Sequence, residues 1–536
     1  MTNNILTLAP SELDYLPDKC PRCFYLAKVK KITVKSFPPP VFSNFDVVQQ
    51  NYFKNLNTNA LSNKLPSGSI MNKSELPFLS ATQLSRLLAV KEVSPVEVTE
   101  AYLERIQSLD SILRAFVTVT AETALVSAKQ SEQEIVKGDH RGPMHSIPVA
   151  VKDQIYTNGL LTTGGSLVFS DFMPTFDATV IENLRKSGAV MLGKLNMTEF
   201  ATSGLSHQFD PPRNPWDLER STGGSSSGSG AATAAFLCAT SLGEDTGGSV
   251  RFPASWCGLA GIRPTWGRVS RYGVMPGVRS MDTVGPLGRT VADCAITLGA
   301  IAGYDPKDRL SSSELVPDYY AELSGDLKGL KIGIVRELVY TDLVEDRVRQ
   351  LIVAAADTMS GLGAQVEEIS IPMAANAGAI NGAIRVEAPV TYGDILRERP
   401  RELAHDNRIA YLASSIMPSP FYYKALRLRA MLRDQVLDVL DRVDLLLSPT
   451  TGIPAQTLGP DLVIDSKVAS NRTPWLLATT FSLANVPALS VPCGFTDDGL
   501  PIGLQIAGRP FDESTVLRAG HCYEQGTAWH IQRPNI

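Results

Sequence analysis

The chain has 536 residues, more than one hydrophobic core usually holds, so we expect a large domain with an appendage or two subdomains. Its 44% hydrophobic and 20% charged residues are typical of a globular protein. A net charge of −5 offers no basic footprint for nucleic acid, and no apolar run is long enough to span a membrane. The amino terminus does not have the pattern of a signal peptide, so we expect a cytoplasmic protein.

The 7 cysteines are scattered along the chain, which is typical of unpaired thiols in a reducing compartment. Only Cys20 and Cys23 have the spacing of metal ligands, and no second Cys or His pair lies near them. We therefore expect free thiols rather than a zinc site. The sequence predicts neither a metal nor a cofactor.

Residues 1–76 differ from the rest, because proline, asparagine and serine interrupt any sustained hydrophobic period. We expect an N-terminal extension of unknown function there and a second domain over residues 77–536. The segment 20–25, CPRCFY, resembles the start of small nuclease domains of the PD-(D/E)xK type. The acidic metal-binding core of such a nuclease does not follow.

Regular elements begin at residue 80. Ser with Gln or Glu three positions later, at 80–83 and 94–97, predicts two capping boxes and therefore two helices. An apolar strand over 145–153, a helix over 180–187 and a strand over 189–192 follow.

The second half continues the alternation of helices and apolar strands. A strand over 329–335, an amphipathic helix over 345–360 and a strand within 361–369 predict a βαβ unit. A charged helix over 422–443 leads into an apolar strand at 445–447, and short strands follow at 487–492 and 500–505. This alternation predicts an α/β fold.

The stretch 223–251 holds two glycine-serine clusters around a small-residue segment that predicts a tightly packed helix. A flexible linker is the simplest interpretation, but linkers seldom lie inside an α/β core. A phosphate-binding loop is excluded, because the required Gly-Lys-Ser/Thr is absent. Residues 224–228 match G-x-S-x-G, but no apolar strand precedes them. Because His405, His521 and His530 follow, a Ser-His-acid esterase stays open.

The same stretch, together with residues 151–153, closely resembles the amidase signature family of serine hydrolases. The resemblance covers residues 77 to 510, and further matching segments are 214–217, 257–265, 267–273, 282–286 and 503–505. It implies an α/β fold with a large mixed sheet covered by helices on both faces. It also implies an amide-bond hydrolase that acts through a lysine, a serine held by a cis peptide and a nucleophilic serine.

Matched motif by motif, the resemblance implies that the lysine is Lys152, the bridging serine Ser225 and the nucleophile Ser249. The backbone N–H groups of the loop at 246–249 would form the oxyanion hole, with Thr246, Gly247 and Gly248 ahead of the nucleophile.

Lysine serves as a base only when it is neutral, and burial lowers its pKa. Lys152 follows an apolar run, which favours burial, and Asp153 should point to the other face of the strand. Glu244 departs from the family, which often has threonine there. An inward Glu244 would favour charged Lys152 and oppose its function as a base, so we expect Glu244 to face solvent or to pair with a cation.

Neighbouring residues have predicted supporting roles. Asp245 and Arg251 flank the nucleophile and would position its loop, and Ser227 could join their network. By loose analogy with the family, a substrate loop would contain Thr202, Ser203 and Gly204. His207 is expected in a surface or substrate-loop position rather than in a catalytic triad.

The leading hypothesis is therefore an amidase that releases ammonia or an amine from a small-molecule carboxamide without a cofactor. One alternative is the glutaminase subunit of a tRNA-dependent amidotransferase. Such subunits typically carry a segment resembling SNLARYDG, whereas residues 383–393 here read AIRVEAPVTYG. A second alternative is a catalytically inert scaffold of the same fold. No nucleic-acid or membrane partner is expected, and a homodimer stays open.

Overall fold

The computed structural model describes residues 72–202, 207–323, 325–458 and 477–536, all of which belong to one compact unit. Most of its strands form one sheet of 11 strands, in the order β1-β3-β2-β6-β8-β7-β12-β13-β11-β9-β10. The strands are β1 (Phe116–Val119), β2 (Pro148–Lys152), β3 (Val190–Leu195), β6 (Thr240–Glu244), β7 (Ala260–Arg263), β8 (Val284–Gly288), β9 (Lys331–Val335), β10 (Gln365–Ile369), β11 (Leu445–Pro449), β12 (Ala488–Phe495) and β13 (Pro501–Gly508). A separate hairpin pairs β4 (Arg213–Asn214) with β5 (Asp217–Ser221).

The sheet is mixed. β2 pairs in parallel with β3 and β6, and β9 pairs in parallel with β10 and β11. The strands β6, β8, β7, β12, β13 and β11 are joined by antiparallel pairings between neighbours. The predicted α/β class and mixed sheet are confirmed.

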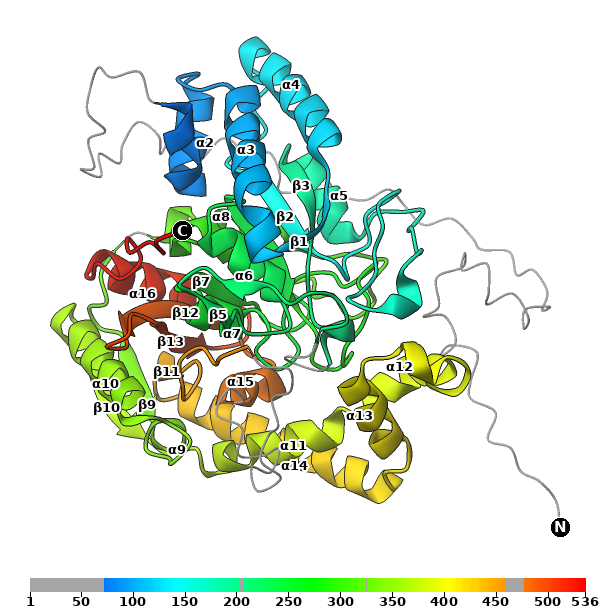
Figure 1. Cartoon of the computed structure of the whole chain (residues 1–536). Helices are drawn as coiled ribbons and strands as arrows, with labels where there is room; N and C mark the ends of the chain where they lie inside the picture. The colour runs from blue at the N-terminus through cyan, green and yellow to red at the C-terminus, as the bar shows by residue number, and fades with distance from the viewer. Residues whose placement is uncertain (1–71, 203–206, 324, 459–476) are drawn as a thin grey trace, which may run out of the picture. The chain divides into compact units, whose positions relative to one another are not determined.

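Figure 1 shows the helices around this sheet. They are α2 (Ala81–Ala89), α3 (Pro95–Leu113), α4 (Ala121–Lys137), α5 (Thr179–Lys186), α6 (Ser227–Ala234), α7 (Arg251–Trp256), α8 (Val291–Ile301), α9 (Arg336–Val339), α10 (Asp346–Gly361), α11 (Ala377–Ile384), α12 (Glu387–Glu398), α13 (His405–Ser415), α14 (Ser419–Leu440), α15 (Thr479–Ala484) and α16 (Glu513–Gln525). Short 3-10 helices are η2 (Lys73–Phe78), η3 (Leu167–Phe169), η4 (Glu199–Ala201), η5 (Ala321–Leu323), η6 (Pro372–Asn376) and η7 (Pro400–Glu402).

Helices cover both faces of the sheet. Leu489 of β12 contacts α16 at Gly520, whereas the next residue, Ser490, lies beside Gly503 of β13 and Ser255 of α7. Successive side chains of a strand point to opposite faces, so α7 and α16 lie on opposite faces. This arrangement confirms the predicted cover on both sides.

Local sequence signals set several elements. Both predicted capping boxes form, with Ser80 and Gln83 at the start of α2 and Ser94 and Glu97 at the start of α3. The predicted βαβ unit is β9-α10-β10, whose two strands pair in parallel. At the amino-terminal end, η2 already packs buried Leu76, so the described fold begins a few residues before the predicted start at 77.

The pairing of three strands brings the predicted site to one edge of the sheet. In the parallel pair β2 and β6, Val151 lies opposite Leu242, so Lys152 and Glu244 both end their strands at the same edge. The antiparallel strand β8 begins there, because Val284 lies opposite Glu244. Asp282, two residues before β8, therefore reaches this edge as well.

Candidate active site

The core of the candidate site is the pair Lys152 and Ser225. Every residue of β2 is buried, and Lys152 ends this strand with a fully buried side chain. Its Nζ lies 2.7 Å from Oγ of Ser225, although 73 positions separate the two residues. Ser225 precedes α6, and its peptide bond with Gly224 is cis. The structure thus brings together two residues predicted to act in one proton relay.

The surroundings of Lys152 favour the neutral amine. Burial lowers its pKa below the ordinary 10.5, although the nearby Glu244 carboxyl acts in the opposite direction. Asp153 does not pair with Lys152. Its Oδ1 lies 3.4 Å from Nζ of Lys194, and Oδ2 accepts from the Thr163 backbone N–H at 2.8 Å. The predicted alternation of Lys152 and Asp153 is therefore found in the fold.

Of the two positions expected for Glu244, facing solvent or pairing with a cation, the first is wrong, because the side chain points inward beside Lys152. Its side chain is buried, and Oε2 lies 3.4 Å from Nζ of Lys152. The reason is the register of the sheet. It places the end of β6 beside Lys152, so the Glu244 side chain lies among buried groups. Burial, reinforced by the charge of Asp282, raises the pKa of Glu244 to about 8.

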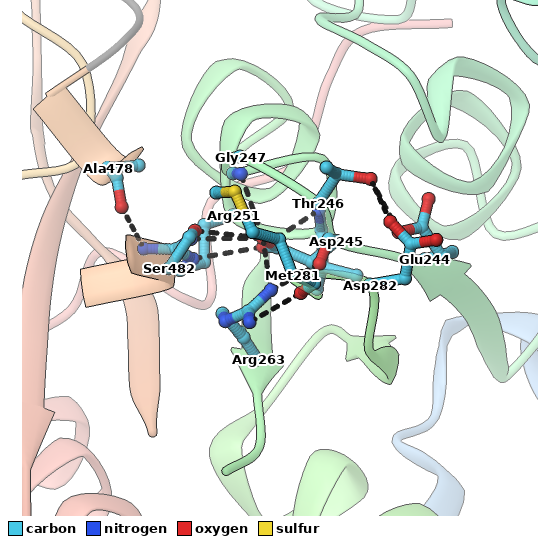
Figure 2. A network of polar contacts seen from close by, with 12 residues as sticks. Glu244, Asp245, Thr246, Gly247, Arg251, Arg263, Met281, Asp282, Ala478 and Ser482 are labelled. Atoms are coloured by element: carbon cyan, nitrogen blue, oxygen red, sulfur yellow. Dashed lines mark hydrogen bonds and ion pairs between the residues drawn. The ribbon is translucent and has the colours of Figure 1, made fainter. Parts of the chain in front are cut away.

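The loop after β6 is built on Asp245, as Figure 2 shows. Arg251 at the start of α7 donates to both carboxylate oxygens, at 3.0 Å each, and Arg263 of β7 donates to Oδ1 at 3.2 Å. Burial alone would raise the pKa of Asp245, but the two guanidinium groups outweigh it and hold this pKa well below its ordinary range. Arg251 also donates to the Ala478 carbonyl and to Ser482 Oγ, both at 2.7 Å. Asp245 and Arg251 therefore fix the loop in the way that their sequence position suggested.

The backbone N–H groups of this loop differ in availability. The Gly248 N–H donates to Oδ1 of Asp245 at 2.8 Å, so it is occupied, contrary to the prediction that it is an oxyanion donor. No hydrogen bond within the described part of the chain is recorded for the N–H groups of Thr246, Gly247 and Ser249. These three stay available as donors to a developing oxyanion.

Ser249 lies between this loop and α7. Its side chain is 8% exposed, whereas Ser225 is fully buried, so Ser249 is the serine of the two that solvent reaches. No partner is recorded for its hydroxyl among the described residues. Nearby, the Thr479 hydroxyl donates to the Gly247 carbonyl at 3.0 Å and ties the loop to α15.

Other predicted residues lie further from this centre. Ser227 Oγ lies 2.9 Å from Nε2 of His207 and has no recorded bond to the Asp245 network within the described ranges, contrary to the prediction. Thr202 Oγ1 lies 2.8 Å from the hydroxyl of Tyr411 of α13, and its carbonyl accepts from Arg385 at 2.7 Å. Ser203 and Gly204, and likewise Cys20, Cys23 and the extension up to residue 71, lie outside the described residues.

Sequence reasoning missed three polar residues near the site. Asp282 belongs to the matching segment 282–286, from which no site residue was predicted. Its Oδ1 accepts from the Thr246 hydroxyl at 2.7 Å. Asn381 of α11 is 3% exposed, and its Oδ1 has no partner among the described residues. A Cβ built on Gly247 would lie 3.9 Å from this oxygen. Arg385, at the end of α11, has a buried Nε without a partner in the described part.

Neither a metal site nor a membrane span is found in the part of the chain that the structure describes. These residues contain no group of three or more His, Cys, Asp or Glu side chains arranged to hold a metal ion. None of the helices in the described ranges is both long and apolar enough to cross a membrane.

The buried Lys152–Ser225 pair lies at the edge of a mixed sheet covered by helices, next to a glycine-serine loop. This combination is typical of the amidase class. The model of the Amidase family matches residues 97–517, so the chain belongs to the amidase family. A curated relative, the A-type subunit of the glutamyl-tRNA(Gln) amidotransferase of Geobacter metallireducens (strain ATCC 53774 / DSM 7210 / GS-15), is 42% identical over 494 residues, which cover 86% of this chain and all of the relative.

Solved structures agree with this assignment. A chain from a vestigial protein complex that bears on the origins of an s-triazine catabolic enzyme has a TM-score of 0.79 at 33% identity, covering 85% of this chain and 100% of its own. A bacterial aryl acylamidase of the amidase signature family has a TM-score of 0.77 at 25% identity, covering 84% of this chain and 97% of its own. The family and fold expected from the motifs are confirmed.

Proposed function

We propose that this protein cleaves amide bonds through an acyl-enzyme on Ser249, with Ser225 as proton relay and Lys152 as base. The observation that carries the proposal is the 2.7 Å contact between Nζ of Lys152 and Oγ of Ser225, both fully buried. Amide carbonyls are poor electrophiles, so the attacking serine must lose its proton as it attacks. A buried lysine with a lowered pKa can take that proton at neutral pH.

Each step balances its protons. As Ser249 Oγ bonds to the amide carbon, its proton passes to Ser225 Oγ, and the Ser225 proton passes to Lys152 Nζ. The oxyanion that forms accepts hydrogen bonds from the backbone N–H groups of Gly247 and Ser249, with Thr246 as a third donor. When the C–N bond breaks, the protons return along the same path to the leaving nitrogen. Water then attacks the acyl carbon and passes one proton along the same relay to Lys152. That proton returns to Ser249 Oγ as its bond to the acyl carbon breaks, which releases the carboxylic acid and restores the enzyme.

For the substrate we favour the amide of glutamine, with this chain as the A-type subunit of a tRNA-dependent amidotransferase. The support is the curated relative of that kind, which is 42% identical and matched over its whole length. An A-type subunit implies partner subunits, and the other proteins of such an assembly would receive the ammonia.

A stand-alone amidase acting on a small linear amide is the second candidate. Residues 383–393 favour it, because they depart from the segment resembling SNLARYDG that the A-type subunits carry. In this chain they comprise the end of α11, the short link that contains Arg385, and the first part of α12. The aryl acylamidase at a TM-score of 0.77 shows that the fold also occurs in an enzyme of this kind.

Two assays separate these alternatives. A fluorophosphonate probe should label the purified chain and fail to label Ser249→Ala; equal labelling of both would refute the serine mechanism. Hydrolysis of glutamine, aliphatic amides, aryl amides and esters should then be measured by the release of ammonia, amine or alcohol, with and without the other subunits of a tRNA-dependent amidotransferase. Glutamine turnover that rises with those subunits supports the amidotransferase, whereas undiminished turnover of another amide by the chain alone supports the amidase. An inert scaffold would do neither.

Two further proposals concern the whole chain. We place the amidase domain at residues 77–536 and treat residues 1–76 as an extension. Its last residues form part of η2 and pack buried Leu76, so deletion of residues 1–71 is the change that should leave amide hydrolysis intact. We also propose a cytoplasmic location, because the 5 cysteines within the described ranges are all free thiols: Cys238, Cys257, Cys294, Cys493 and Cys522.

A further inference from the structure

Glu244 is a buried carboxyl group beside the proposed base. Its Oε2 lies 3.4 Å from Nζ of Lys152, and its backbone carbonyl lies 3.2 Å from the same nitrogen. Among the described residues, Lys152 is its only ion-pair partner within 4 Å. If Glu244 were a carboxylate, it would hold Lys152 as an ammonium ion, which cannot accept a proton.

The Thr246 hydroxyl shows where a proton must lie. Its Oγ1 is 2.8 Å from Oε1 of Glu244 and 2.7 Å from Oδ1 of Asp282. A hydroxyl has one proton and can donate it to only one of the two carboxyl groups. The other carboxyl group must itself donate to Thr246 Oγ1, because two oxygens at this distance need a hydrogen between them. One of the two acids is therefore protonated.

Asp282 is the acid with backbone hydrogen-bond donors. Its Oδ2 accepts from the Gly277 N–H and its Oδ1 from the Val278 N–H, each at 2.8 Å. Backbone donors stabilise a carboxylate, and Glu244 Oε1 has no such donor within the described residues. The proton therefore lies on Glu244, which donates it to Thr246, and Thr246 donates to Asp282.

The other charged or titratable groups around Glu244 do not provide a counter-ion. Arg263 of β7 donates to Asp245 and to the Met281 carbonyl. Arg385 at the end of α11 donates to the Thr202 carbonyl, and Tyr392 of α12 donates to the Pro276 carbonyl. Asp245, the next residue in the chain, is held by Arg251 and Arg263. Within the described part of the chain, Lys152 is therefore the one cation in contact with Glu244. Burial disfavours the carboxylate form of Glu244, which agrees with its raised pKa.

We propose that Glu244 is a positioning residue, held as a neutral carboxylic acid by Thr246 and Asp282, that keeps Lys152 a neutral amine. The inference rests on the proposed function, because it concerns the protonation of the proposed base. A neutral amine can make all three contacts of Lys152: its two N–H groups would donate to the Glu244 carbonyl and Oε2, and its lone pair would accept from Ser225. During the reaction the proton from Ser225 goes to Nζ, and Glu244 keeps its own.

The test is the pH dependence of kcat/KM in Thr246→Val, which keeps the side-chain shape and removes the acceptor for the Glu244 proton. Glu244 then passes its proton to Lys152, so the acidic midpoint should rise by about one pH unit. Activity should fall about fivefold at the wild-type midpoint and about tenfold well below it, and should return at alkaline pH. In the double variant Glu244→Gln with Thr246→Val, the midpoint should return to the wild-type pH, because an amide cannot ionise. Thr99→Val removes a buried hydroxyl in α3 and is the matched control.

Three results would overturn the inference: an unchanged midpoint in Thr246→Val, a shift that persists in the double variant, or a midpoint that falls in Glu244→Gln alone. The last would mean that Glu244 is a charged partner of Lys152. Should Thr246→Val not fold, Asp282→Asn tests the same step and should raise the midpoint in the same direction. If the wild-type protein were not labelled by the fluorophosphonate at Ser249, the proposed function itself would be refuted. The pH profiles above do not test labelling, so the two failures can be told apart.

Discussion

The Nζ atom of Lys152 and the Oγ atom of Ser225 lie 2.7 Å apart, and both residues are fully buried. The contact joins the end of β2 to the turn before α6. Packing alone does not explain a lysine at this position, because burying an amine is unfavourable unless it is paired or neutral. A proton-accepting role explains both residues at once.

Lys152→Met should remove most activity at neutral pH, because the side chain keeps its volume but cannot accept a proton. We expect kcat/KM at pH 7 to fall by about 10²–10⁴, the usual contribution of a general base. Residual turnover should rise toward alkaline pH, where hydroxide replaces the base. Lys307→Met, which removes a lysine paired with Glu182 at the surface, is the control and should retain its activity. A kcat/KM and a pH profile in Lys152→Met that equal those of the wild type would contradict the assignment.

Ser249→Ala and Ser225→Ala should each reduce kcat by about 10⁴–10⁶, because members of a catalytic unit act together. They should differ in labelling, since only Ser249→Ala removes the atom that reacts with a fluorophosphonate. Ser229→Ala is the matched control: it is a buried serine of α6 whose hydroxyl donates to the Leu242 carbonyl. Turnover in Ser249→Ala at the level of Ser229→Ala would exclude the acyl-enzyme.

Much of this fold could be predicted from local signals. The capping boxes at Ser80 and Ser94 depend on residues three positions apart, and the strands depend on short apolar runs. The direction of Glu244 could not be predicted, because it depends on the register of β6 against β2 and β8, far apart in the sequence. The occupied N–H of Gly248 depends likewise on the side-chain position of Asp245. Properties that depend on distant contacts need the assembled sheet.

Asp245→Asn should destabilise the protein, because it leaves Arg251 and Arg263 buried without a counter-ion. Removing one member of a buried ion pair costs about 3–5 kcal/mol of unfolding free energy. The low pKa of Asp245 means that its stabilisation is complete above the ordinary value of 3.8 and is lost as the pH falls below it. The difference in free energy of unfolding between wild type and variant, measured by urea unfolding, should therefore become smaller at acidic pH. Glu104→Gln, at an exposed ion pair with Lys73, should change stability by less than about 1 kcal/mol. A similar small change in Asp245→Asn would show that the loop is not held by this carboxylate.

Gly228→Ala tests how tightly α6 must pack to hold Ser225. A Cβ at Gly228 would lie 2.4 Å from the Ala115 carbonyl oxygen and 2.6 Å from the Asn196 nitrogen, and backbone atoms cannot rotate away. Overpacking of this kind costs about 1–3 kcal/mol or more. Because Ser225 directly precedes α6, a shift of the helix also separates Ser225 from Lys152, so kcat should fall even where the variant is fully folded.

Gly361→Ala is the matched control for Gly228→Ala. It ends α10, a Cβ there meets no atom within 4 Å, and the gain in helix propensity should stabilise the protein by up to about 1 kcal/mol with no effect on kcat. Thermal unfolding and kcat should be measured for both variants and compared with the wild type. If Gly228→Ala had the same thermal stability and the same kcat as Gly361→Ala, the close packing of α6 would not be the reason that Ser225 lies against Lys152.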